Sequence, residues 1–173
     1  ITTDQQLKAA LLEFIAYRET TRKVDPVQEA ILAIVGRTVG IDFFPTPQSL
    51  AERMARMARI KVGMLVLEPS AGTGTLADAA KAAGAMVHVI EIGSELQNIL
   101  TLKGHTLVGT DFDEYDSHQE YDAILMNPPF LNRTDARHIQ KAYSHLKSGG
   151  HLVAIASESL FFNRDKCALA FCE

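Results

Sequence analysis

The stretch Asn127-Pro128-Pro129-Phe130 is the first candidate for chemistry, because it directly follows an apolar run that is typical of a buried strand. Proline has no N–H to give to a sheet ladder, so the two prolines end the strand and stiffen the backbone behind Asn127. Two interpretations remain open at this point. The stretch is either a strand end followed by a core phenylalanine, or the edge of a binding site.

If the stretch is a binding edge, its two carbonyl groups suit a planar amino group, the acceptor that the family resemblance described below implies. An exocyclic amine on a purine is a poor nucleophile, because its lone pair is spread into the ring. The side-chain carbonyl of Asn127 and the backbone carbonyl of Pro128 can accept hydrogen bonds from its two N–H groups. The prolines preorganise these acceptors where positive charge develops on the nitrogen, and Phe130 offers a face on which a base can stack.

A glycine-rich turn is the second candidate site. Gly72-Thr73-Gly74-Thr75-Leu76-Ala77 matches the pattern G-x-G-x-x-[GA] between a predicted strand and a predicted helix, where glycines let the backbone approach a ligand closely. Glu91 ends the next predicted strand about 20 positions later, the place of a carboxylate that binds ribose hydroxyls. The pattern favours nucleoside binding; the alternative is a tight turn with a solvated Glu91.

A dinucleotide enzyme would use the same turn to hold a pyrophosphate. Glu68 counts against this alternative, because it places a carboxylate directly before the glycines. After the third predicted strand, Asp111 can accept a hydrogen bond from an adenine amino group, with Phe112 flanking the base. A solvated acidic loop is the alternative there, since further carboxylates follow Asp111.

Five stretches occur in the order found in S-adenosylmethionine-dependent methyltransferases. The chain most resembles the amino-group methyltransferases that act on adenine N6 in DNA, including modification subunits of restriction systems and phage or plasmid orphan enzymes. The Asn-Pro-Pro-aromatic motif also occurs in guanine-N2 RNA enzymes and protein-glutamine enzymes, whereas the Pro-Thr-Pro segment favours DNA adenine. A non-catalytic cofactor-binding module is a third hypothesis. The five stretches, within residues 43–162, are FFPTPQSLAERM, LEPSAGTGTLADA, VIEIGSEL, GTDFDEYD and ILMNPPF.

The resemblance implies S-adenosylmethionine as the cofactor, no metal, and two sets of site residues. The target amine would be held by Asn127, Pro128, Pro129 and Phe130. Ser70 stands where many methyltransferases have their first glycine. We expect the region that would recognise the target to be missing from this stretch of chain. The residues implied to bind the cofactor are Phe44, Thr46, Glu68, Ser70, Ala71, Gly72, Gly74, Glu91, Ile92, Asp111 and Phe112.

Alternating strand and helix patterns predict the sheet that must bring these residues together. They indicate an α/β fold with a doubly wound, mostly parallel sheet, similar to a Rossmann fold. Five strands fall short of the usual seven in such methyltransferases, so we expect the C-terminal strands to be missing. The predicted strands lie in 64–70, 85–92, 105–112, 121–130 and 151–159, and the predicted helices in 75–84, 94–104, 135–150 and 160–173.

The N-terminal part predicts helices. An amphipathic helix is expected over 4–23, a second is opened by Asp25-Pro26, and a third starts near Pro47. We therefore expect a helical extension over 1–42 and a cofactor-binding methyltransferase domain over 43–173, truncated at its C-terminus. The third helix carries basic residues on one side, for which a solvated face is the favoured interpretation and phosphate contact the alternative. These residues are Arg53, Arg56, Arg59 and Lys61.

The bulk composition limits how the chain can meet nucleic acid. Its net charge is −4 over 173 residues, whereas proteins that hold nucleic acid over their whole surface are usually basic. DNA contact must then come from a local patch or from a separate target-recognition domain or subunit. Cys167 and Cys172 match no zinc spacing. With no leader and no apolar stretch near the ~20 residues of a membrane span, we predict a cytoplasmic protein with free thiols.

Overall fold

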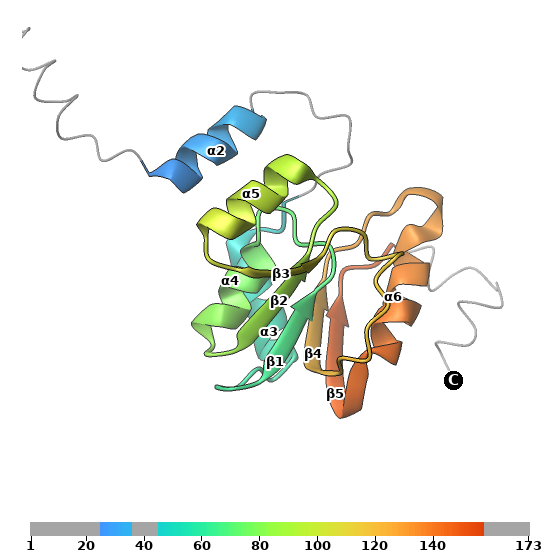
Figure 1. Ribbon diagram of the computed structural model, residues 1–173. Helices are drawn as coiled ribbons and strands as arrows, with labels where there is room; N and C mark the ends of the chain where they lie inside the picture. Colours follow the sequence, from blue (N-terminus) through green and yellow to red (C-terminus); the bar gives the residue numbers. More distant parts are fainter. Residues whose placement is uncertain (1–24, 36–44, 158–173) are drawn as a thin grey trace, which may run out of the picture.

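A five-stranded parallel sheet forms the centre of the molecule, with the strand order β3-β2-β1-β4-β5 (Figure 1). The computed structural model describes residues 25–35 and 45–157. All four pairs of neighbouring strands are parallel, so the predicted α/β fold with a doubly wound sheet is confirmed. The strands are β1 Leu65–Glu68, β2 Met86–Ile90, β3 Thr106–Gly109, β4 Tyr121–Met126 and β5 Leu146–Ala154.

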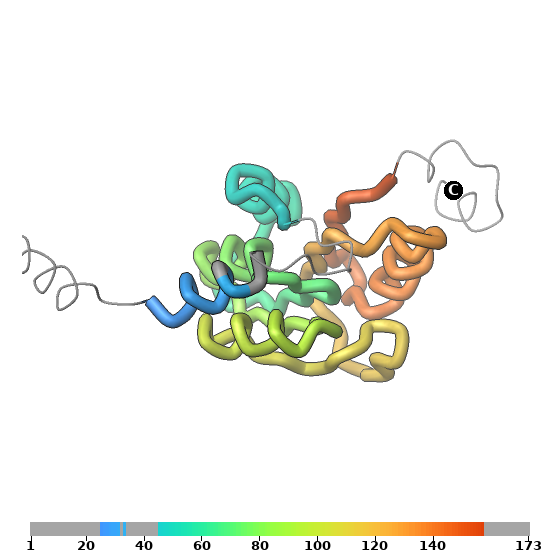
Figure 2. Tube along the Cα trace, turned by 90° about the horizontal axis from the view of Figure 1, so that it is seen from above, coloured from blue at the N-terminus to red at the C-terminus, as the bar shows by residue number. Residues whose placement is uncertain are grey.

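Helices connect the strands and cover both faces of the sheet. Seen from above, α3 lies beside α4, whereas α6 lies apart from them (Figure 2). None of the helices within the described ranges is long and apolar enough to cross a bilayer. The helices are α2 Pro26–Val35, α3 Gln48–Met57, α4 Thr75–Ala82, α5 Ser94–Leu102 and α6 Thr134–Ser144, with a short 3-10 turn, η1, at Leu131–Arg133.

The two faces of the sheet carry separate apolar cores. Successive residues of a strand point to opposite faces, so Val66 packs with α3 and α4, whereas Leu67 packs with α6. Leu125 and Ile124 of β4 divide in the same way. This explains why the strands appear in the sequence as continuous apolar runs, as is typical of parallel sheets that are buried on both sides.

The second predicted helix is confirmed at its start. Asp25 caps α2, because its Oδ1 accepts a hydrogen bond of 2.9 Å from the backbone N–H of Val27, and Pro26 occupies the first helical position. Val27 and Ile31 then pack against Leu96 of α5. The predicted helices over 4–23 and 160–173, both cysteines and Phe44 lie outside the described residues, and the division into 1–42 and 43–173 remains a prediction.

The predicted boundary between the last described helix and strand is wrong. The Gly149-Gly150 pair predicts a helix stop near residue 150, but α6 ends at Ser144 and β5 begins at Leu146. Leu146 pairs with Tyr121, after which the register jumps so that His151 pairs with Ala123. The intervening residues bulge out of the ladder, and Gly149 takes a φ of +79° there. The two glycines therefore serve a β-bulge, not a helix end.

Gly74 shows why the turn between β1 and α4 needs glycine. It has a φ of +81°, and a Cβ atom at this position would lie 2.8 Å from Leu100 Cδ2 of α5. The backbone of the turn thus lies directly against the neighbouring helix. Gly63 has a similar φ of +83°, but no atom lies within 4 Å of where its Cβ would be. Comparing substitutions at the two glycines therefore distinguishes the cost of backbone strain from the cost of steric contact.

We predict that Gly74→Ala lowers the free energy of unfolding by roughly 2–5 kcal/mol. About 1–2 kcal/mol comes from the left-handed backbone and about 1–3 kcal/mol from overpacking against Leu100. Gly63→Ala should cost only the first of these amounts. Urea denaturation of both variants tests the prediction, and equal losses would show that the contact with Leu100 does not matter.

Candidate functional site

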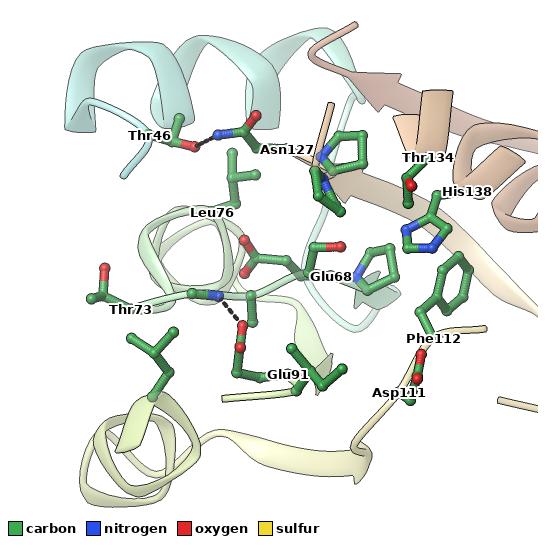
Figure 3. A pocket seen from close by; sticks show the side chains of 18 of the residues that line it. Thr46, Glu68, Thr73, Leu76, Glu91, Asp111, Phe112, Asn127, Thr134 and His138 are labelled. Carbon is green, nitrogen blue, oxygen red and sulfur yellow. Dashed lines mark hydrogen bonds between the residues drawn. The ribbon is translucent and has the colours of Figure 1, made fainter. Parts of the chain in front are cut away.

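A pocket of about 280 Å³ opens at the carboxyl ends of the strands (Figure 3). Ligand sites in open parallel sheets lie at this edge, because the loops after neighbouring strands converge there. The pocket brings together nearly all the residues predicted to form the two sites. Predicted site residues in its lining are Thr46, Glu68, Ser70, Ala71, Gly72, Glu91, Ile92, Asp111, Phe112, Asn127, Pro128, Pro129 and Phe130.

One predicted site residue in the described range does not line this pocket. Gly74 is absent from the lining, and it faces Leu100 and His105 instead. Its role as a cofactor contact stays a prediction, whereas the structure gives Gly74 a conformational role. Gly74 precedes the first residue of α4 with a left-handed backbone, and this turns the chain from the pocket into the helix.

Glu91 is held inside the site by the glycine-rich turn. Its Oε2 accepts a hydrogen bond of 2.7 Å from the N–H of Gly72, and its Oε1 accepts one of 2.7 Å from the N–H of Gly93. Burial raises the pKa of Glu91, and these backbone donors act in the opposite direction. The interpretation of a solvated Glu91 is therefore wrong. Each oxygen has a second lone pair that can receive a further donor.

Glu68 occupies the N-terminus of α4 from the end of β1. Its side chain is buried, and its Oε2 accepts a hydrogen bond of 2.7 Å from the N–H of Ala77 in the first turn of the helix. Burial raises the pKa of Glu68 well above its usual range. A helix N-terminus that already binds a carboxylate of its own chain is poorly suited to a pyrophosphate, and this weighs against the dinucleotide alternative.

The loop after β3 is fastened to α6 through Asp113. Its carboxylate accepts hydrogen bonds from Arg137 Nη2 at 2.6 Å and from the ring of His138 at 3.1 Å. Its backbone carbonyl accepts one of 2.7 Å from Lys141 Nζ. Burial lowers the pKa of His138, although the Asp113 carboxylate beside it acts to raise the pKa. These contacts fix the loop that carries the adjacent Phe112.

Sequence reasoning missed the contribution of α6 to the site. Thr134, Arg137 and His138 line the pocket, and the ring of His138 meets Phe112 edge-on at 5.2 Å between centroids. A signal was present in the sequence. The acidic loop after β3 and the basic side chains Arg137 and Lys141 of the predicted helix have opposite charges. Only the fold shows that these two segments lie next to each other.

Asn127 lies where the loop before α3 meets the end of β4. Its Nδ2 donates a hydrogen bond of 3.2 Å to Oγ1 of the buried Thr46 (Figure 3). This contact orients the amide, because it places the nitrogen on the Thr46 side. Phe130 is only half-buried and lines the pocket. The four-residue stretch therefore lines the pocket, and Phe130 is not a fully buried core residue.

Comparison with known proteins agrees with this architecture. A family model described as the methyltransferase small domain matches residues 50–165. The chain belongs to this family. No curated protein sequence matches the chain closely enough to establish a relationship.

Solved structures similar to this methyltransferase small domain share its fold. TrmN from Thermus thermophilus is 24% identical with a TM-score of 0.54, over 63% of this chain and 38% of TrmN. PH1948 from Pyrococcus horikoshii, a candidate RNA methyltransferase, is 22% identical with a TM-score of 0.56, over 85% of this chain and 77% of that protein. The chain thus spans well under half the length of TrmN.

The glycopeptide N-methyltransferase MtfA in complex with S-adenosyl-L-methionine is 20% identical with a TM-score of 0.53, over 73% of this chain and 63% of MtfA. Membership in the methyltransferase small-domain family supports S-adenosylmethionine as the cofactor, whereas the similarity to MtfA shows a shared fold. The carboxylate-lined pocket suits such a cofactor, which carries positive charge. Within residues 25–35 and 45–157, no three His, Cys, Asp or Glu side chains gather to hold a metal ion.

We predict that Glu68→Gln changes how stability depends on pH. The folded-state pKa of Glu68 lies above its unfolded value of about 4.3, so the folded protein holds the extra proton above that pH. The wild-type free energy of unfolding should therefore fall, relative to the variant, as pH rises from about 4.3 through the raised pKa. Urea denaturation of both proteins across this range measures the difference, and parallel curves would contradict the prediction.

Proposed function

We propose that this chain transfers a methyl group from S-adenosylmethionine to a planar amino group, and that its acceptor is the N6 amine of adenine in DNA. The observation that carries the proposal is that Asn127 and the Glu91 carboxylate line one pocket. An acceptor edge and a nucleoside edge thus face a common space. A methyl donor at one and an amine at the other would be held for direct transfer, which can supply several kcal/mol of rate acceleration.

The cofactor side is assigned to the turn after β1 and the ends of β2 and β3. Glu91 receives the ribose hydroxyls on its remaining lone pairs, and Ile92, which is 65% exposed, covers the adenine. Asp111 accepts from the adenine amino group, with Phe112 beside it. Glu68, Ser70 and the glycine-rich turn face the methionine end.

The reaction itself needs little beyond orientation. When bound, the cofactor supplies a methyl group on a sulfonium, whose neutral thioether is an excellent leaving group. The carbonyl oxygens of Asn127 and Pro128 accept hydrogen bonds from the two N–H groups of the target amine. With the cofactor held beside it, the nitrogen lone pair would form the new bond to the methyl carbon. The electron pair of the broken carbon–sulfur bond would stay on sulfur, and the extra amine proton would leave to solvent. In a duplex the base must first flip out, at a cost of a few kcal/mol.

Thr46 is assigned as a positioning residue for this step. It accepts from the Asn127 amide nitrogen, and so keeps the carbonyl oxygen of the same amide as the end offered to the target amine. This role differs from the cofactor contact that the family resemblance implies for Thr46. The two assignments are separable, because only the positioning role acts on methyl transfer without changing cofactor affinity.

Guanine N2 in RNA and protein glutamine present the same planar amine to the same acceptor pair. Incubating the full-length protein with labelled S-adenosylmethionine and separate DNA, RNA and protein mixtures distinguishes them. Label in DNA adenine supports the proposal, and label only in RNA or protein replaces its acceptor. Cofactor binding with no transfer to any of the three would favour the non-catalytic module.

We predict that Glu91→Gln weakens binding of S-adenosylhomocysteine about 10-fold or more. The substitution removes the negative charge that strengthens hydrogen bonds from the ribose, and bonds to charged groups contribute roughly 1.5–3 kcal/mol. Calorimetry with S-adenosylhomocysteine measures the loss. NAD serves as the comparison ligand for the wild-type protein, and tighter binding of NAD than of S-adenosylhomocysteine would overturn the cofactor assignment.

We predict that Asn127→Ala lowers the rate of methyl transfer at least about 100-fold, the range seen when one preorganised polar group is removed from a transition state. Affinity for S-adenosylhomocysteine and the melting temperature should barely change. Asn127→Asp keeps an acceptor and should retain part of the activity. A variant that loses stability but turns over normally per folded molecule would assign Asn127 to the fold alone.

Substitutions of Thr46 test whether it positions the Asn127 amide. Thr46→Val keeps the shape of the side chain but removes the hydroxyl, so it should lower kcat while leaving cofactor affinity unchanged. Thr46→Ser restores the hydroxyl and should recover most of the rate. If Thr46→Val instead weakens cofactor binding with kcat unchanged, Thr46 acts on the cofactor and not on Asn127.

A further inference from the structure

The outer side of α3 and the turn that follows it form a basic face. The helix buries a stripe of small and apolar residues against α4, so its remaining sides point to solvent. Basic side chains occupy much of that outer side, and all of them are exposed. The buried stripe consists of Ala51, Met54, Ala55 and Ala58. The basic face consists of Arg53, Arg56, Arg59 and Lys61.

None of the four side chains of the basic face has an ion pair or hydrogen bond with the part of the chain that the structure describes. Other basic residues there are engaged: Lys103 pairs with Asp78 at 2.6 Å and Lys147 with Asp122 at 2.8 Å. The one carboxylate on α3, that of Glu52, accepts from the amide of Gln48. Within residues 25–35 and 45–157, the four cationic side chains are therefore available to an anionic partner outside the chain.

The basic face starts close to the acceptor side of the pocket. Thr46, which binds Asn127, stands two residues before α3, and Figure 3 shows the helix beside both. With a helical rise of 1.5 Å per residue, Arg53 lies about 8 Å and Arg56 about 12 Å along the axis of α3 from its first residue, Gln48. Arg59 and Lys61 follow beyond the end of the helix. A polymer with its reacting unit at Asn127 would pass within reach of these side chains.

We propose that the basic face binds the phosphate backbone of the DNA strand that presents the target base. The proposal rests on the proposed function and names how its substrate is held. Phosphates are the abundant anions of that substrate, and arginine binds them through two parallel N–H bonds. The whole chain carries a net charge of −4, so attraction to DNA requires a local concentration of positive charge such as this one.

Salt dependence of DNA binding tests the proposal. Each phosphate contact releases counterions, so log K falls with log salt by about 0.9 per contact. We expect Arg53→Gln with Arg56→Gln to make this slope shallower by about two, and to weaken binding equally on unrelated sequences. The measurement is fluorescence anisotropy of a labelled 20-base-pair duplex, titrated with the 173-residue protein in excess S-adenosylhomocysteine at several salt concentrations.

Two further double variants make the experiment specific. Lys81→Gln with Lys147→Gln also removes two positive charges. Lys81 donates to the backbone just after α5 and Lys147 to Asp122, so neither should contact DNA and the salt slope should stay unchanged. Arg53→Lys with Arg56→Lys retains the charges and should retain the slope. Thermal melting of each variant verifies that it is folded.

The outcomes separate the proposal from the proposed function. Two results would overturn the basic face as a phosphate site even if DNA is methylated. One is an equal decrease of the salt slope in the Lys81/Lys147 variant, and the other is an unchanged slope in the variant with Arg53→Gln and Arg56→Gln. Binding to an RNA of the same sequence without binding to DNA would overturn the choice of partner. Absence of both DNA binding and methyl transfer to DNA would overturn the surface and the acceptor together, while cofactor affinity reports on the methyltransferase site independently.

Discussion

The hydrogen-bonded carboxylate of Glu91 is the contact on which the site geometry depends. It joins the turn after β1 to the end of β2 through Gly72 and Gly93. Parallel strands with crossover helices place their carboxyl ends at one edge, but they do not by themselves fix the loops there. The buried carboxylate does so, because two short backbone hydrogen bonds compensate part of the cost of removing it from water. The same atoms remain able to accept from a ligand.

Charge is divided sharply over this small domain. The pocket is lined by Glu68, Glu91 and Asp111, with Arg137 paired to Asp113 at its edge. The basic side chains without a partner in the described part of the chain lie outside the pocket, on α3 and the turn after it. Under the proposed function, a cationic sulfonium ligand and a polyanionic acceptor would meet opposite charges in adjacent places. This division would let an acidic chain act on DNA, because a phosphate would not have to enter the pocket. The acidic lining of the pocket also disfavours a dinucleotide, whose pyrophosphate is negatively charged. The glycine pattern alone fits both kinds of ligand.

Local sequence signals were sufficient to place β1 to β4 and to predict most of the residues that line the pocket. Apolar runs followed by glycine or proline mark β1 and β4, and the residues after them fall at one edge because parallel topology demands it. The signals failed where distant contacts decide. Gly149 adopts its conformation because β5 must realign with β4, and Thr46 meets Asn127 across 81 positions of chain. The role of His138 depends on α6 being placed against the loop after β3. No periodicity within either segment reports such pairings.

The placement of Thr46 between Pro45 and Pro47 has a mechanical consequence. Proline fixes one backbone torsion on each side, so the step from Thr46 into α3 is stiff, and the hydrogen bond to Asn127 continues that step into the site. The Asn127 amide and the start of α3 are thus linked through Thr46. A displacement of α3 would therefore be passed through Thr46 to the amide, and a displacement of the amide would be passed to the start of α3.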